Sequence, residues 1–379
     1  LNILNLANLT KECIKTIFLN NLKINNFRNH KSFEIDFNKQ RTIVLGCNGI
    51  GKSNLLESVE FLSQLRSSRA LSEKDLIEND SDMASIIGQI DFTDDLKINL
   101  FRKGSKKIYF NESLLKKQSD IKNYIQSVCF CSNDINIVKN EPSYRRAWID
   151  KVVSQLEPVY VELINRFNRL LKQRSHFWRS ESFQKDQNSE IIDSFDIQMS
   201  RISTRIFRRR RRALSKIKPY VSYWHNHLSK SQEKVGIEYL SGMENISKEE
   251  EEEDIICKKI AEQLFNQRQV EAITGKCNFG PHRDDIEFLI NGISVRKYGS
   301  SGQQRTFILA LKIAEMDLLH KTLNIPPILI LDDVLAELDI TRQNLLLNSV
   351  GKDSQCIISA THIDKLSQSL LASSQMIYL

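Results

Sequence analysis

Gly46-Cys47-Asn48-Gly49-Ile50-Gly51-Lys52-Ser53 decides the fold of this chain, because it fits the phosphate-loop pattern G-x-x-x-x-G-K-[ST]. Glycines at these positions let backbone N–H groups surround a phosphate without Cβ clashes. An apolar strand expected at 42–45 precedes the loop, and a helix expected at 52–65 follows it with its positive N-terminus toward the anion. This context favours nucleotide binding over a chance glycine-rich turn. We expect Lys52 to reach the β- and γ-phosphates and the Ser53 hydroxyl to ligate Mg²⁺.

The composition is that of a globular chain with a mild basic excess. Hydrophobic residues make up 41% and charged residues 27% of the 379 residues, and the formal net charge is +7. Such a balance suits an anionic partner such as nucleic acid, but only clustered charge would point to one. The length allows two lobes of ordinary domain size, about 100–200 residues each.

The cysteines and the N-terminal residues indicate the compartment. The seven cysteines are scattered, and the pair Cys129 and Cys131 has no matching pair that would complete a zinc site. Free thiols in a reducing cytosol are therefore favoured over disulfides. The first sixteen residues lack the features of a signal peptide, and no apolar run approaches the ~20 residues of a membrane span. We expect a cytoplasmic protein without a membrane segment.

The order of strand and helix patterns predicts the architecture. Alternating and fully apolar strand patterns fill the N-terminal third and return near the C-terminus, whereas helix formers fill the middle of the chain. The sequence therefore predicts an α/β fold whose ATPase lobe is made by residues 17–135 and 275–379. A helical lobe of residues 136–274 is inserted between these two parts.

A second candidate motif for nucleotide chemistry lies far from the phosphate loop. The apolar run 328–331 reads as a buried parallel strand, and it ends in Asp332 and Asp333. A carboxylate at the end of such a strand holds Mg²⁺ in phosphate-loop proteins, which is the role expected for Asp332. Asp333 is then placed to polarise the attacking water. The wide gap between the two motifs favours the ABC class over compact GTPases and kinases.

A third motif, at 299–304, precedes an apolar helix. Ser301 and Gln304 fit an S-x-x-Q capping box, so one interpretation is simply a well-capped helix. The other is a second glycine-rich helix N-terminus, with Ser301 and Gly302 able to bind phosphate. In the ABC class, this motif from one subunit closes on the nucleotide held by the other, which implies a dimer.

Taken together, these motifs resemble the RecF family, whose members are ABC-type ATPases related to the heads of SMC proteins. The resemblance runs from about Leu22 to Thr361. The stretches that carry it are Gly46 to Glu57, Pro142 to Arg146, Leu171 to Arg174, Gly280 to Asp285, Tyr298 to Thr306 and Leu331 to Asp339.

The resemblance implies roles for individual residues. ATP and Mg²⁺ are held by the loop from Gly46 to Ser53 and by Asp332, while Asp333 stands where ABC enzymes usually have a catalytic glutamate. Residues implied to act at the nucleotide or the dimer seam are Ser301 and Gly302 in trans, Asp339 of the D-loop, His362 as the switch histidine, and Arg28 and Asn29 at the nucleotide edge. The glutamine of the ABC Q-loop has no clear counterpart, since Ser132-Asn133-Asp134 occupies its place.

The resemblance also implies a function. It is that of an ATP-dependent DNA-binding protein of recombinational repair and replication, which dimerises on ATP binding. The dimer grips double-stranded DNA at single-strand gaps or junctions, and a weak DNA-dependent ATPase activity resets it. The family partners are RecR and RecO.

A basic segment in the predicted helical lobe has two interpretations. Between Asp196 and Glu233 the chain has no acidic residue. The basic residues of this segment include Arg201, Arg205, Arg208, Arg209, Arg210, Arg211, Arg212, Lys216 and Lys218. They can contact DNA, or they can be solvated or paired internally, with the acidic run 249–254 as an available counter-charge.

Other ABC-type proteins are the alternatives. A transporter nucleotide-binding subunit should have a clear Q-loop and a surface for membrane helices, and the arginine-rich insert argues against it. An SMC-like structural protein needs long heptad arms, for which the insert is too short and irregular.

Overall fold

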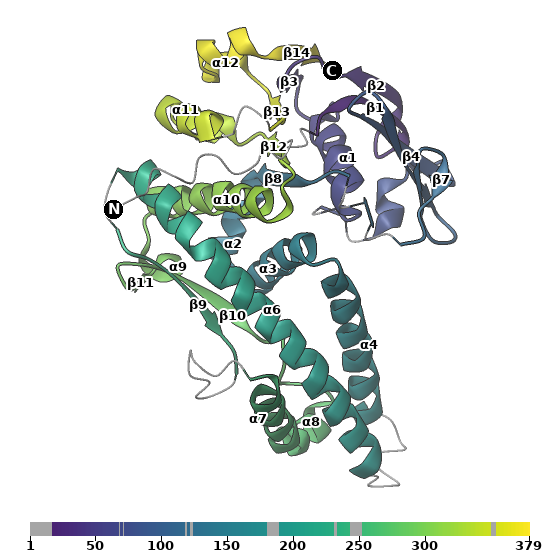
Figure 1. Ribbon diagram of the computed structural model, residues 1–379, viewed down its shortest axis with the longest axis vertical. Helices are drawn as coiled ribbons and strands as arrows, with labels where there is room; N and C mark the ends of the chain where they lie inside the picture. The colour runs from purple at the N-terminus through teal and green to yellow at the C-terminus, as the bar shows by residue number, and fades with distance from the viewer. Residues whose placement is uncertain are drawn as a thin grey trace, which may run out of the picture. The chain divides into compact units, whose positions relative to one another are not determined.

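The computed structural model describes residues 17–67, 69–70, 72–117, 120–121, 124–179, 189–230, 233–242, 252–349 and 354–379 (Figure 1). Within them, the chain forms two compact units. The ATPase unit consists of the chain up to Ser132 and from Glu315 onward, and the inserted unit is Asn133–Ala314. Residues 275–314, which we expected in the ATPase lobe, therefore pack with the insert. The reason is that β10 (Asp285–Ile290) pairs with β9 (Val235–Leu240) of the insert along its whole length.

A parallel sheet forms the base of the ATPase unit, in the order β14-β3-β13-β12-β8. The bounds of its strands are Arg41–Leu45 for β3, Ser127–Cys131 for β8, Ile328–Asp332 for β12, Cys356–Ala360 for β13 and Gln375–Tyr378 for β14. The inner strands are almost wholly buried, as expected for apolar runs covered on both faces. Because every neighbouring pair is parallel, the loops after β3, β8, β12 and β13 leave from the same edge of the sheet.

An antiparallel sheet, in the order β2-β1-β4-β5-β6-β7, completes the core of the ATPase unit. Its strands are β1 (Leu19–Phe27), β2 (His30–Asp36), β4 (Met83–Ile90), β5 (Asp94–Phe101), β6 (Lys107–Phe110) and β7 (Ser113–Leu114). This arrangement confirms that strands fill the N-terminal third of the chain.

Helix α1 (Lys52–Gln64) contacts both sheets, and its apolar face belongs to one core cluster with them. The helix lies so close to β4 that a Cβ on Gly88 would be 2.4 Å from Leu62 Cδ2. The buried Gln355 also links the sheets, because its amide accepts from Leu19 N at 2.9 Å and donates to Leu19 O at 3.0 Å. The phosphate loop at the start of α1 is therefore held by a rigid core.

Short helices complete this unit around the sheet edges. They are η1 (Glu73–Leu76), η4 (Leu335–Glu337), α11 (Ile340–Ser349), η5 (Ile363–Lys365) and α12 (Gln368–Ser373).

The inserted unit is mainly helical, as predicted. Its elements are η3 (Ser132–Ile135), which begins one residue before the unit, α2 (Asn136–Lys139), α3 (Pro142–Leu156), α4 (Val159–Arg179), α6 (Ser189–Ser229), α7 (Glu253–Asn266), α8 (Arg268–Thr274), α9 (Val295–Tyr298), β9, β10 and β11 (Ile293–Ser294). Helix α10 (Ser301–Leu323) begins in this unit and ends in the other. None of the described helices is long and apolar enough to cross a membrane.

A buried charge cluster ties three helices of the insert together. Arg174 of α4 is fully buried, and its guanidinium donates to Asp196 of α6 and, at 2.8 Å, to Glu271 of α8. The indole N–H of Trp178 donates to the same Glu271 carboxylate at 3.1 Å. Removing either acid would break one of two buried ion pairs of Arg174, so these contacts fix how the helices pack.

Candidate nucleotide-binding site

The phosphate loop lies at the edge of the parallel sheet where the strands end, between β3 and α1. Gly49 and Gly51 have φ angles of +82° and +122°, in the left-handed region that side chains disfavour. At Gly51 a Cβ would also lie 2.6 Å from His30 Nε2. The local backbone therefore requires the glycines that the sequence pattern contains.

Lys52, the first residue of α1, is almost fully buried. Its ammonium group donates to the carbonyls of Gly46 at 2.7 Å and Cys47 at 3.1 Å. The loop thus holds a desolvated ammonium group against its own backbone. The N-terminus of α1, which carries a partial positive charge, lies beside it. This arrangement is suited to an anion with several negative oxygens.

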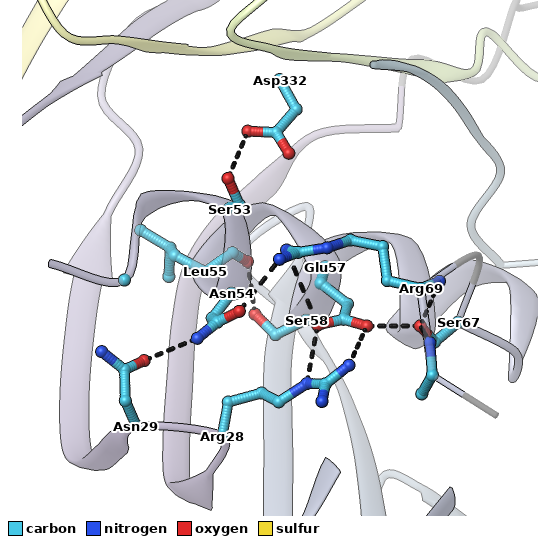
Figure 2. A network of polar contacts seen from close by, with 12 residues as sticks. Arg28, Asn29, Ser53, Asn54, Leu55, Glu57, Ser58, Ser67, Arg69 and Asp332 are labelled. Atoms are coloured by element: carbon cyan, nitrogen blue, oxygen red, sulfur yellow. Dashed lines mark hydrogen bonds and ion pairs between the residues drawn. The ribbon is translucent and has the colours of Figure 1, made fainter. Parts of the chain in front are cut away.

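The two nucleotide motifs predicted from the sequence meet in the structure, although 279 positions separate them. Ser53 Oγ donates to Asp332 Oδ1 at 2.8 Å, as Figure 2 shows. Ser359, at the end of the neighbouring strand β13, donates to the same oxygen at 2.8 Å. The sequence did not predict a role for Ser359; the available signal was one polar residue near the end of an otherwise apolar strand. A hydroxyl and a carboxylate form an oxygen-only set that fits a hard cation such as Mg²⁺.

Asp333 has an unusual environment. Its φ of 54° is rare for a residue with a side chain, and its N–H is fixed by Ser359 Oγ at 2.9 Å. One of its carboxylate oxygens is buried without a hydrogen-bond partner among the described residues. Burial raises the pKa of Asp333, the charge of Lys52 lowers it, and the charge of Asp332 raises it. The site therefore holds a buried acceptor beside the Ser53–Asp332 pair.

The turn after β1 holds the phosphate loop and the start of α1 through hydrogen bonds, one of which is drawn between Asn29 and Asn54 in Figure 2. Asn29 Nδ2 donates to Ile50 O at 3.0 Å, and Asn54 Nδ2 donates to Asn29 Oδ1 at 2.8 Å. His30 Nε2 lies 3.1 Å from Gly51 O and donates to that carbonyl. Asn29, expected at the nucleotide edge, thus contacts the loop backbone directly.

Arg28 is held by a buried carboxylate on α1. Its guanidinium makes a bidentate pair with Glu57, at 2.9 and 2.8 Å, and donates to Asp75 O at 2.9 Å. Ser67 also donates to Glu57, and Arg69 Nη1 lies 3.9 Å from it. The nucleotide-edge role of Arg28 stays a prediction, because the guanidinium is engaged in fixing the turn against α1.

The cap of α10 differs from the sequence prediction by one residue. The capping box is formed by Ser300 and Gln303: Ser300 Oγ accepts from Gln303 N at 3.2 Å, and Gln303 Oε1 accepts from Ser300 N at 3.0 Å. The pairing predicted for Ser301 and Gln304 is therefore wrong, because Gln304 is buried and donates to Val295 O at 3.0 Å. The shift leaves the Ser301 side chain exposed at the first helical turn, with Gly302 beside it.

The remaining predicted residues lie in loops at the edge of the parallel sheet. Asp339 is exposed, and its Oδ1 accepts from Arg342 N at 2.9 Å at the start of α11. His362 is exposed two residues after β13. Ser132 follows Cys131, which pairs with Asp332 across the sheet. This geometry leaves the switch, D-loop and Q-loop assignments as predictions.

Two stretches of the RecF resemblance contact each other within the inserted unit. Arg145 of α3 pairs with Asp285 at 2.6 Å, and Arg146 donates to Asp284 O at 2.8 Å. Arg210 of α6 reaches the same loop, where it donates to Pro281 O at 2.7 Å. The stretches at 142–146 and 280–285 therefore form one structural motif around the buried Arg210.

Most of the consecutive arginines on α6 are paired internally. Arg210 makes a bidentate pair with Asp150, at 2.8 and 2.9 Å. The other ion pairs are Arg209 and Arg212 with Glu157, and Arg205 and Arg208 with Glu253. Glu253 belongs to the acidic run expected as counter-charge, of which residues 249–251 lie outside the described residues. These pairs favour the internally paired interpretation for 205–212, and DNA contact by these arginines stays a prediction.

The parallel sheet, the phosphate loop and the distant carboxylate motif with an inserted helical unit define an ATPase head of the SMC and RecF type. Residues 18–376 match the family described as RecF/RecN/SMC N terminal domain. An Smc head bound to the C-winged helix domain of ScpA shares the fold, with a TM-score of 0.50 at 16% identity over 94% of this chain and 91% of that one. The predicted fold class is thereby confirmed.

Closer relatives identify the family. The DNA replication and repair protein RecF of Synechococcus sp. (strain CC9605) is 44% identical over 89% of this chain and 92% of that protein. RecF of Nostoc punctiforme is 36% identical over 96% of this chain and 97% of that protein. The recombination mediator protein RecF with ATP, of the RecFOR pathway, superposes with a TM-score of 0.85 at 30% identity, over 93% of this chain and 94% of that one. The chain belongs to the RecF family.

A double-mutant cycle on Arg28 and Glu57 distinguishes two roles for Arg28. It can fix the turn against α1 through Glu57, or it can contact the nucleotide directly. If Arg28 acts by fixing the turn, Glu57→Gln and Arg28→Gln should each weaken ATP binding, and the double variant should be little worse than either. Each single change should also lower the free energy of unfolding by about 2 kcal/mol, because charge-assisted hydrogen bonds are lost. ATP titration and urea unfolding measure both effects. Full additivity in ATP affinity would instead indicate that Arg28 touches the nucleotide.

Arg210 should matter for stability far more than its neighbours in the arginine run. Arg210→Gln leaves Asp150 and Asp284 without their buried partner, at a cost of about 3–5 kcal/mol. Arg212→Gln is the matched control, because the Arg212 side chain is 53% exposed; its loss should cost less than about 1 kcal/mol. Urea unfolding of the two variants checks this, and equal midpoints would contradict it.

Proposed function

We propose that this chain is an ATP-dependent DNA-binding protein of recombinational repair and replication, in which ATP binding joins two copies around DNA. The observation that carries the proposal is the Ser53–Asp332 hydrogen bond, which joins both nucleotide motifs in a member of the RecF family. Whole-chain similarity to the ATP-bound mediator of the RecFOR pathway supports the same function.

ATP binding rests on the phosphate loop. The Lys52 ammonium, with backbone amides of the glycine-rich loop, would offset the charge of the β- and γ-phosphates. On binding, Lys52 exchanges its contacts with the Gly46 and Cys47 carbonyls for phosphate oxygens. Ser53 and Asp332 would hold Mg²⁺, which would neutralise part of the phosphate charge.

Hydrolysis is assigned to Asp333. Its partly buried carboxylate has an acceptor oxygen without a hydrogen-bond partner among the described residues, and burial raises its pKa. Ser359 fixes both the Asp333 N–H and the Asp332 carboxylate, so the two acids keep distinct orientations. An aspartate reaches one methylene less far than the glutamate usual in ABC enzymes, which suits the slow hydrolysis of a molecular switch.

Dimerisation is assigned to the exposed N-terminus of α10. Ser301 and Gly302 present a helix start, already capped by Ser300, to the γ-phosphate held by the other copy. Asp339 and His362, both exposed, line the same seam in this proposal. ATP then acts as the bridge between two copies, and its hydrolysis reopens the dimer.

The DNA and protein partners follow from the family. The formal net charge of +7 favours a polyanion, and the closed dimer grips duplex DNA at single-strand gaps or junctions. RecO and RecR, which give the RecFOR pathway its name with RecF, are the proposed protein partners.

Asp333→Asn should retain ATP binding and lower the hydrolysis rate by about 100-fold or more, because an amide cannot accept a proton from water. The ATP-bound dimer should accumulate in consequence. Phosphate release and size measurement with ATP test this, with the exposed Asp95→Asn as control. A normal hydrolysis rate would move the catalytic role away from Asp333.

Ser301→Arg should abolish ATP-driven dimerisation and leave ATP binding by the monomer within about twofold. The long side chain obstructs close approach of the α10 N-terminus to the other copy's nucleotide. Light scattering with and without ATP measures the dimer, and DNA binding is read in the same samples. Ser105→Arg adds the same charge at an exposed turn and should dimerise normally. A dimer formed by Ser301→Arg would refute the role of this motif in trans.

A further inference from the structure

The C-terminal part of α6 carries basic and aromatic residues along one side. Lys216, Tyr223 and His227 are spaced by seven and four residues, so they lie on the same side of the helix, and Lys230 follows directly after its last residue. All four side chains are exposed, and Tyr223 is 61% exposed. We call these four residues the lysine–aromatic face. The opposite side of the helix, with Ile217, Val221 and Leu228, is buried.

The charges of this face differ from those of the arginine run that precedes it. Five arginines of the run, at 205, 208, 209, 210 and 212, are ion-paired with Asp150, Glu157 or Glu253. For Lys216 and Lys230, no carboxylate of the described part of the chain lies within salt-bridge distance. The next acid in the sequence, Glu233, lies 3.6 Å from the buried His225. Within the described part of the chain, these lysine charges are therefore left for an external anion.

The aromatic rings make this face more than a positive patch. The rings of Tyr223 and His227 are parallel, at 4°, with centroids 6.1 Å apart. Trp224 packs edge-on against both rings, at 5.1 and 5.9 Å, and supports them from the half-buried side. Exposed flat rings between lysines match the chemistry of unpaired nucleotides, whose bases stack on aromatic side chains while their phosphates meet ammonium groups.

We propose that the lysine–aromatic face binds single-stranded DNA. The proposal rests on the DNA-binding function proposed above and gives it a separate contact for the unpaired strand of a gap. Duplex DNA offers its phosphates to lysines but keeps its base faces stacked inside, so it gains nothing from Tyr223. The face is thus specific for unpaired bases.

The first test compares Tyr223→Ala and Tyr223→Phe in the full-length protein. Binding of a labelled dT oligonucleotide and of a blunt duplex is measured by anisotropy. Tyr223→Ala should weaken dT binding about tenfold, because one stacking platform is lost. Tyr223→Phe keeps the ring and should bind dT like the unmodified chain. Duplex binding and the unfolding midpoint should be unchanged in both.

A fluorescence measurement reports on the same face. Of the three tryptophans, Trp148 and Trp178 are buried and Trp224 lies against the face. Adding dT should quench the tryptophan emission of the unmodified chain, and Trp224→Phe should remove most of that quenching. Exchanging both Lys216 and Lys230 for Gln should lower the salt slope of dT binding by about 0.7 per lost phosphate contact.

The outcomes distinguish this proposal from the proposed function. If the unmodified chain binds dT and Tyr223→Ala binds it equally well, the lysine–aromatic face is not the single-strand site. Equal weakening by Tyr223→Ala and Tyr223→Phe would also overturn it, because stacking would not be the cause. If the unmodified chain binds neither dT nor duplex, the DNA-binding function itself fails.

Discussion

The contact between Ser53 and Asp332 is the interaction on which the rest of the site depends. It joins the phosphate loop to a strand 279 positions away, and it can form only because the strands of the sheet are parallel and end at one edge. Ser359 completes the arrangement by holding Asp332 and the backbone of Asp333 together. The turn of Asn29 and His30 fixes the loop from the other side.

In the inserted unit, positively charged residues serve two purposes on helix α6. Arg210 is buried and fully engaged with Asp150 and the loop at 280–285, so its charge stabilises the packing of the insert. C-terminal to the paired arginines, Lys216 and Lys218 have no ion-pair partner among the described residues of the chain. The aromatic rings of Tyr223 and His227 follow them on the same helix. Charge density along a helix is therefore a poor guide to a nucleic-acid surface, because acids from other elements pair with part of that charge.

In both units, the residues that position a site are buried, whereas the residues proposed to contact a partner are exposed. In the ATPase unit, Lys52 and Asp332 are positioned by buried strands and helix α1. In the insert, the buried Arg174 cluster fixes α4, α6 and α8. The residues proposed to contact a second copy or DNA, such as Ser301 of α10 and Tyr223 of α6, are exposed to solvent. Such an arrangement keeps a site preformed while leaving its partner groups accessible.

The sequence by itself determined the phosphate loop, the apolar strand ending in Asp332 and Asp333, and the helical nature of the insert, because each depends on local backbone preference and hydrophobic periodicity. It did not determine that 275–314 packs with the insert, since pairing of β10 with β9 joins distant segments. The capping residue of α10 and the partners of Arg28, Arg210 and Ser359 were likewise decided only by tertiary structure. The role of each of these side chains depends on which charges and hydrogen-bond donors the fold brings within about 3 Å of it. The hydrophobic periodicity of the sequence carries no information about such distant partners.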